Sequence, residues 1–66
     1  MNVKCESFEA KRVGELTRVR LKFFDGSQIT CQGPTENFSH TEIEVDGVVT
    51  VNCQFEDFNL CEWDDE

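Results

Sequence analysis

Apolar and polar side chains alternate residue by residue in three stretches of this chain, which is typical of β-strands that bury one face. In the clearest stretch, residues 18–24, Val19, Leu21 and Phe23 share one face and three basic residues share the other. We therefore expect a mainly β protein. The predicted strands are 18–24, 42–46 and 48–55, with weaker ones at 3–8, 28–31 and 59–63.

Two Asp-Gly pairs lie between strand-like stretches and predict hairpin turns. At Asp25-Gly26 a two-residue turn would place apolar residues opposite polar ones. A three-residue loop, 24–26, instead pairs Leu21 with Ile29 and Val19 with Cys31. The apolar match selects the longer loop, with Gly26 as the left-handed residue of a bulge.

The same criterion at the second pair predicts the three-residue loop Val45-Asp46-Gly47, which pairs Ile43 with Val49. In this register Ile43 and Val45 are expected to face the core. Three acids would then form a row on the outer face, with carboxylates about 6.6 Å apart. This row consists of Glu42, Glu44 and Asp46.

The predicted fold is a small antiparallel sheet or partly open barrel of about five strands with two hairpins. One short helical turn is expected near 34–40, with Pro34 near its start. Residues 10–16 are expected to form a loop, because Gly14 interrupts their helical spacing. All 66 residues are assigned to a single acidic β domain, 1–66.

The net charge of −8 is distributed unevenly along the chain. All six basic residues lie within the first 22 positions, where three acids leave a net charge of +3. The remaining eleven acids give −11 with no Lys or Arg among them, which together make −8. A surface that is acidic only for solubility would mix both signs. The distribution therefore favours a positively charged partner over a merely solvated face.

Nucleic acid and anionic membranes are unfavourable partners, because both would repel a domain of this charge. Arg18, Arg20 and Lys22 are expected to pair with acids on neighbouring strands and not with a nucleic-acid backbone. We predict that the partner is bound by acids of the C-terminal two thirds and one tryptophan. The predicted partner-binding residues are Glu42, Glu44, Asp46, Glu56, Asp57, Glu62, Trp63, Asp64 and Asp65.

The sequence contains no phosphate-binding loop, nucleophile elbow or His-Glu-x-x-His motif, so we expect no catalytic residues and no cofactor. The only histidine, His40, is expected at the surface. Four cysteines are too widely spaced to indicate zinc, so no metal is predicted. Buried free thiols are the favoured interpretation, with disulfides as the alternative.

The N-terminus lacks an apolar signal segment and no window is long enough to span a membrane, which predicts a cytoplasmic protein. An acidic β chain of this size with strand-spaced carboxylates resembles phage-encoded anti-CRISPR proteins of the DNA-mimic kind. The resemblance implies a partner in the bacterial host cytoplasm: the Lys/Arg-rich DNA-binding surface of a Cas subunit in a type I CRISPR complex. Glu42, Glu44 and Asp46 would replace target-DNA phosphates there, and Trp63 or exposed Phe24 would anchor the contact.

Two other classes of function stay open. One is an acidic protein–protein interaction module unconnected with nucleic acid, and the other is a cysteine-stapled structural domain. The sequence is compatible with a monomer or a homodimer. Competition by DNA separates mimicry from a general interaction module, and a count of free thiols tests the stapled domain.

Overall fold

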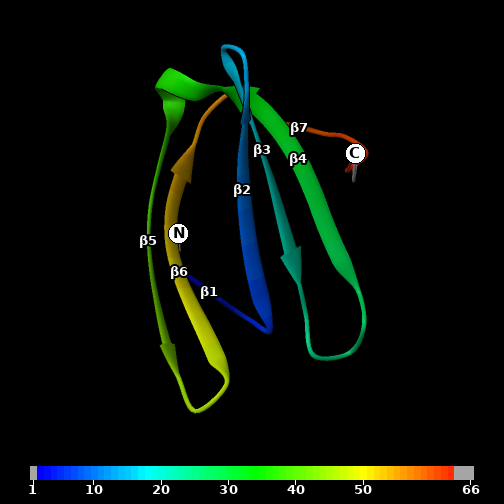
Figure 1. Ribbon diagram of the computed structural model, residues 1–66, viewed down its shortest axis with the longest axis vertical. Coiled ribbons are helices and arrows are strands. Elements are labelled where there is room, and N and C mark those ends of the chain that lie inside the picture. The colour runs from blue at the N-terminus through cyan, green and yellow to red at the C-terminus, as the bar shows by residue number, and fades with distance from the viewer. Residues whose placement is uncertain (1, 64–66) are drawn as a thin grey trace.

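The computed structural model describes residues 2–63 and shows a mainly β protein with two antiparallel sheets that do not close into a barrel (Figure 1). The first sheet has the strand order β1-β6-β5, and the second has the order β2-β3-β4-β7. The elements are β1 (Asn2–Cys5), β2 (Ser7–Val13), β3 (Leu16–Lys22), β4 (Gln28–Pro34), the 3-10 helix η1 (Thr35–Asn37), β5 (Phe38–Val45), β6 (Val48–Phe55) and β7 (Asn59–Leu60). The predicted fold class and the helical turn near 34–40 are confirmed, with seven strands in place of about five.

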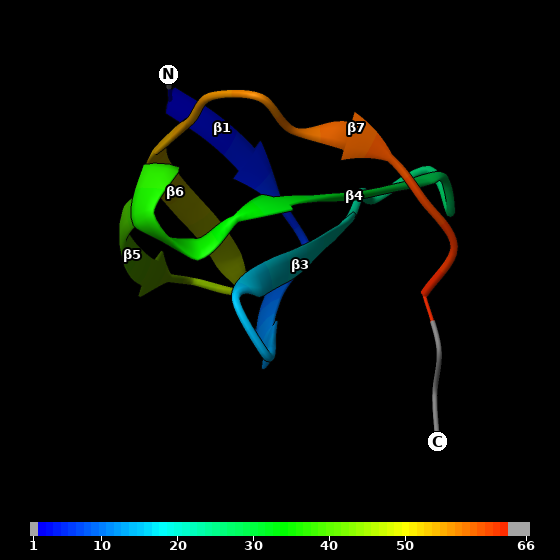
Figure 2. The ribbon, with the colours of Figure 1, turned by 90° about the horizontal axis from the view of Figure 1, so that it is seen from above.

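Buried residues of both sheets form the apolar core, where Leu21 of the second sheet packs with Val49 and Val51 of the first. Figure 2 shows the backbone of the two sheets from above. The largest fully buried side chains of the core are Val19 of the second sheet and Val51 of the first. Three thiols pack with them as small apolar groups, which agrees with the favoured interpretation of the cysteines. The buried apolar residues are Cys5, Val19, Leu21, Cys31, Val49, Val51 and Cys53.

The register of the β3–β4 hairpin is as predicted. Leu21 lies opposite Ile29, and Val19 lies opposite Cys31. The backbone N–H of Phe23 donates to the Ser27 carbonyl, which leaves three residues in the loop. Gly26 supplies the positive φ of 90° that the bulge in such a loop needs.

The prediction of a loop over residues 10–16 is wrong, because this segment forms the end of β2, the turn of a third hairpin and the start of β3. β2 runs through Val13, which lies opposite Leu16, so the chain reverses in the two residues Gly14 and Glu15. Gly14 adopts a φ of 63° at the first position of the turn, where a hairpin favours glycine. The predicted strand 3–8 is also divided, since the chain crosses from the first sheet to the second at Glu6.

The predicted register of the second Asp-Gly hairpin is wrong by one residue. Val45 lies opposite Val48, so the turn contains only Asp46 and Gly47, and Ile43 lies opposite Thr50. Both turn residues take positive φ, 53° and 80°, as a two-residue hairpin turn that matches strand twist requires. The shift moves every side chain of β5 to the opposite face. Ile43 and Val45 therefore point away from the core and are 66% and 61% exposed.

Candidate acidic binding edge

The carboxylates of Glu42 and Glu44 lie on the core side of the first sheet, along its edge strand β5. Glu42 is opposite Val51 and Glu44 is opposite Val49, and residues opposite one another share a face. Both acids remain exposed because, within residues 2–63, β5 has a neighbouring strand on one side only. The pKa of Cys5 is raised mainly by burial and secondly by the charge of Glu42, in keeping with this inward direction.

More acids gather at the end of the molecule where β5 begins. The backbone N–H of Thr35 in η1 donates to the Glu15 carbonyl in the β2–β3 turn. The N–H of Glu56 donates to the Asn37 carbonyl, and the Asn37 amide donates to the Asp57 carboxylate at 3.3 Å. These bonds join three chain segments, so Glu15, Glu36, Glu56 and Asp57 share one end.

We call the acids of β5, of the turn that follows it and of this end the acidic edge; residues 38–41, which carry no acid, separate Glu42 from the η1 end. β5 runs from η1 toward the Asp46-Gly47 turn at the left of Figure 1 and carries Glu42 and Glu44 in its C-terminal half. From Glu42 to Asp46 the chain advances about 13 Å, comparable to about four phosphate steps along one DNA strand. The acidic edge consists of Glu15, Glu36, Glu42, Glu44, Asp46, Glu56 and Asp57.

Four basic side chains, Lys11, Arg18, Arg20 and Lys22, lie on the outer face of the second sheet. Arg20 donates to the Glu9 carboxylate at 2.6 Å, and Arg18 donates to the Gln32 amide oxygen at 2.9 Å. The expected cross-strand pairing is thus confirmed for Arg20. Within residues 2–63, no ion pair joins Glu36, Glu42, Glu44, Asp46, Glu56 or Asp57 to a Lys or Arg. Arg12, in contrast, lines one pocket with Glu15 and Glu36, and Lys4 lies in β1 of the first sheet, so the two signs of charge are only partly separated in space.

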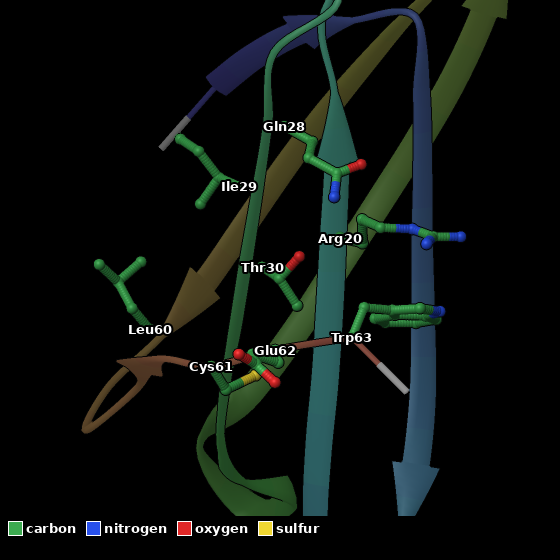
Figure 3. A pocket seen from close by; sticks show the side chains of 8 residues that line it. All are labelled: Arg20, Gln28, Ile29, Thr30, Leu60, Cys61, Glu62 and Trp63. Carbon is green, nitrogen blue, oxygen red and sulfur yellow. The ribbon is translucent and has the colours of Figure 1, made fainter. Parts of the chain in front are cut away.

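Trp63 belongs to the basic region and not to the acidic edge. Its ring covers the Arg20 guanidinium at 4.5 Å, and the Lys11 ammonium lies 6.0 Å from the ring centre. Figure 3 shows Trp63 beside Arg20 over β2 and β3, with Glu62 in the same shallow pocket. Of the predicted partner-binding residues, Glu62 and Trp63 are thus separated from the other acids. Asp64 and Asp65 lie outside the described residues.

Sequence reasoning missed Glu15 and Glu36 as members of the acidic edge. Glu15 occupies a turn that was assigned to a loop, and Glu36 lies in η1. Only the tertiary hydrogen bonds of η1 with the β2–β3 turn and the β6–β7 connection place them beside Glu56 and Asp57. No spacing in the sequence indicates that arrangement.

His40 packs between two aromatic rings on the core side of β5. Its ring centre is 5.0 Å from that of Phe8 and 5.1 Å from that of Phe38. Phe38 in turn lies 6.0 Å from Phe58. This cluster connects the two sheets beside the acids of β5. Among residues 2–63, no group of three or more His, Cys, Asp or Glu side chains is arranged to hold a metal ion.

The buried thiols predict how stability depends on pH. Burial is the largest cause that raises the pKa of Cys5, Cys31 and Cys53 above the ordinary value of 9.0. The folded chain then holds these protons more tightly than the unfolded chain. The resulting stabilisation is complete below the unfolded pKa and is lost as the pH rises through the folded pKa.

We therefore expect the free energy of unfolding, measured by urea titration under reducing conditions, to fall as the pH rises above about 9. At neutral pH the half-buried Cys61 should react with iodoacetamide before the three buried thiols. An unfolding free energy that stays constant up to about pH 10 would contradict this account.

Fold and surface together define a class: a small two-sheet β protein with one acidic edge and one basic face. Comparisons with protein-family models, curated proteins and solved structures found no match. Among the described residues, no helix is long and apolar enough to cross a membrane.

Proposed function

We propose that this protein is a non-catalytic inhibitor whose acidic edge occupies the Lys/Arg-rich DNA-binding surface of another protein. The observation that carries the proposal is the run of exposed carboxylates along β5 and its η1 end, with no basic partner among residues 2–63. Carboxylates at this density raise the concentration of positively charged partners nearby and accelerate their association.

The sheet supports mimicry of a phosphate row better than a loose acidic tail would. Glu42 and Glu44 project from consecutive same-face positions of one strand, so the sheet fixes their separation before any partner binds. Because the backbone is already ordered, binding restricts only the side chains, and the entropy cost is smaller than for a disordered tail. The hydrogen bond from Asn37 to Asp57 similarly orients a carboxylate at the η1 end.

The resemblance to anti-CRISPR proteins leads us to propose the particular target. The partner would be a Cas subunit of a type I complex in the host bacterial cytoplasm, and the bound protein would block recognition of target DNA. Four free cysteines suit a reducing compartment. They also give no support to the alternative of a cysteine-stapled domain.

An acidic interaction module unrelated to DNA is the second candidate. The exposed apolar side chains of Ile43 and Val45, on the opposite face of β5 from Glu42 and Glu44, favour it. Phosphate mimicry alone gives no reason for apolar contact area at this strand. The two candidates differ in whether the partner can bind DNA and the protein at once.

Capture of the partner tests the proposal. The tagged protein is incubated with lysate of the bacterial host, with and without excess duplex DNA, and captured proteins are identified by mass spectrometry. We expect a DNA-binding protein or complex whose capture is lost when DNA is added. Capture that DNA does not change would favour the interaction module, and the absence of any basic partner would contradict both.

A further inference from the structure

β5 is the longest strand at a sheet edge, and its outer side has no neighbouring strand among the described residues. It has eight residues, compared with four in β1, seven in β2 and two in β7. An uncovered edge of this length exposes a row of backbone N–H and C=O groups that another strand can pair with.

The register identifies which backbone groups face outward. Val45 and Val48 flank a two-residue turn, and the pair at such a turn exchanges both backbone hydrogen bonds. Hydrogen-bonded pairs then alternate along the ladder with pairs that are not bonded. The backbone groups of His40, Glu42 and Glu44 consequently point away from β6.

Side chains along this edge differ in chemistry between the two faces. On one face are the carboxylates of Glu42 and Glu44, and on the other are the apolar side chains of Ile43 and Val45, 66% and 61% exposed. A strand lying beside β5 would contact both sets at once. Its matching side chains would alternate between basic and apolar residues, because strand side chains have a period of two.

A second copy of this chain does not meet that requirement. Pairing β5 with its own copy would bring the carboxylates of both strands together, and each chain carries a net charge of −8. Inward-pointing charges on an edge strand are a common protection against self-association. The same acids attract a strand that carries basic residues. They therefore disfavour pairing with a second copy of this chain and favour pairing with a basic partner.

β2 offers a weaker edge. Glu9 and Lys11, of opposite sign, alternate along one face of β2, and Glu9 is already paired with Arg20. A single class of incoming strand would not match both charges.

We propose that the partner adds a β-strand to the free edge of β5 through a segment that alternates Lys or Arg with apolar residues. This inference rests on the proposed function, and specifies how the basic partner is bound. Main-chain hydrogen bonds to residues 40, 42 and 44 would provide affinity. The carboxylates and the apolar pair would provide sequence preference, as in other cases of strand addition.

Peptide binding tests the proposal on the full chain. The probe is a blocked peptide that alternates lysine with valine, and the control peptide has the same composition with the lysines grouped together. We expect the alternating peptide to bind at least about tenfold more tightly, since only it can place each side chain on the correct face. Hydrogen exchange of the amides of residues 40, 42 and 44 should slow at least about tenfold when it binds.

Two substitutions of Glu44 distinguish the contribution of its charge to peptide binding from the contribution of its backbone hydrogen bonds. Glu44→Gln removes a carboxylate and should weaken binding. Glu44→Pro also removes an outward N–H, which an edge strand tolerates, and should weaken binding at least about tenfold beyond Glu44→Gln. A circular dichroism spectrum confirms that each variant is folded.

Equal binding of the two peptides, with no slowing of exchange in β5, would overturn strand addition. The proposed function would survive that result, because the capture experiment decides it independently. Protection of the β5 amides that depends on protein concentration without peptide would also overturn the inference, since a second copy would then occupy the edge.

Discussion

Replacing Gly33 with alanine is expected to destabilise the protein by about 2–3 kcal/mol, a large part of the stability of a domain this small. Gly33 is buried in β4, and a Cβ atom there would lie within 3.0 Å of three ring atoms of Phe58. The ring would have to move, and with it the contact to Phe38 that connects the β6–β7 segment to β5. Urea unfolding of the variant and the parent protein measures the difference.

Gly26→Ala is the matched control for this substitution. Its Cβ would meet nothing within 4 Å, but its φ of 90° disfavours a side chain. We expect a smaller loss, about 1 kcal/mol. A double-mutant cycle gives a second check. In a Phe58→Ala background, Gly33→Ala should lower the free energy of unfolding clearly less than it does in the parent protein. Equal losses of unfolding free energy in both backgrounds would show that the Phe58 ring is not the reason why position 33 needs a glycine.

Reversing two charges on β5 is expected to abolish partner binding while the fold is kept. In Glu42→Lys/Glu44→Lys, two carboxylates at the centre of the acidic edge become repulsive toward a basic surface. Losing one buried charge pair typically costs about 2–5 kcal/mol, so the affinity for the captured partner should fall at least about a hundredfold. Both side chains are exposed, and inward charges still protect the edge of β5.

Glu6→Lys/Glu62→Lys is the control, because it changes the net charge equally at two exposed positions outside the acidic edge. It should retain most of the binding, with a modest decrease from weaker long-range attraction. If the control loses binding as completely as the β5 variant, total charge and not the acidic edge determines recognition. Calorimetry with the purified partner compares both variants under one salt condition.

Much of the fold could be predicted from side-chain alternation. Val19, Leu21 and Cys31 are buried as the pattern of β3 and β4 indicated, and the three-residue loop at Gly26 followed from matching apolar residues. Alternation suffices there because β3 lies between two strands and has one face in the core. A wrong register would expose several of its apolar residues at once.

The same criterion failed at β5 because an edge strand has fewer neighbours. Because the described part of the chain places no strand beyond β5, exposing Ile43 and Val45 costs less free energy than exposing apolar residues of β3 would. The Asp46-Gly47 turn, with two positive φ angles, then decided the register. Glu42 and Glu44 consequently lie on the core side, where the sequence had placed Ile43 and Val45.

The composition of the candidate site could be predicted only in part. Glu42, Glu44, Asp46, Glu56 and Asp57 were expected to act together, and the structure brings them onto one edge with two further acids. Glu62 and Trp63 follow the same acidic stretch of sequence but pack on the basic face. The pairing of β7 with β4 and the contact of Trp63 with Arg20 hold this segment there, and both depend on a tertiary arrangement that the local sequence does not indicate.

Competition for DNA on a purified partner tests the central claim most directly. Labelled duplex DNA is bound to the captured protein, and this protein is added while fluorescence anisotropy reports how much DNA remains bound. We expect DNA to be released as the protein binds, and Glu42→Lys/Glu44→Lys to release none. A stable complex in which the partner holds DNA and this protein together would contradict the claim that the acidic edge occupies a DNA-binding surface.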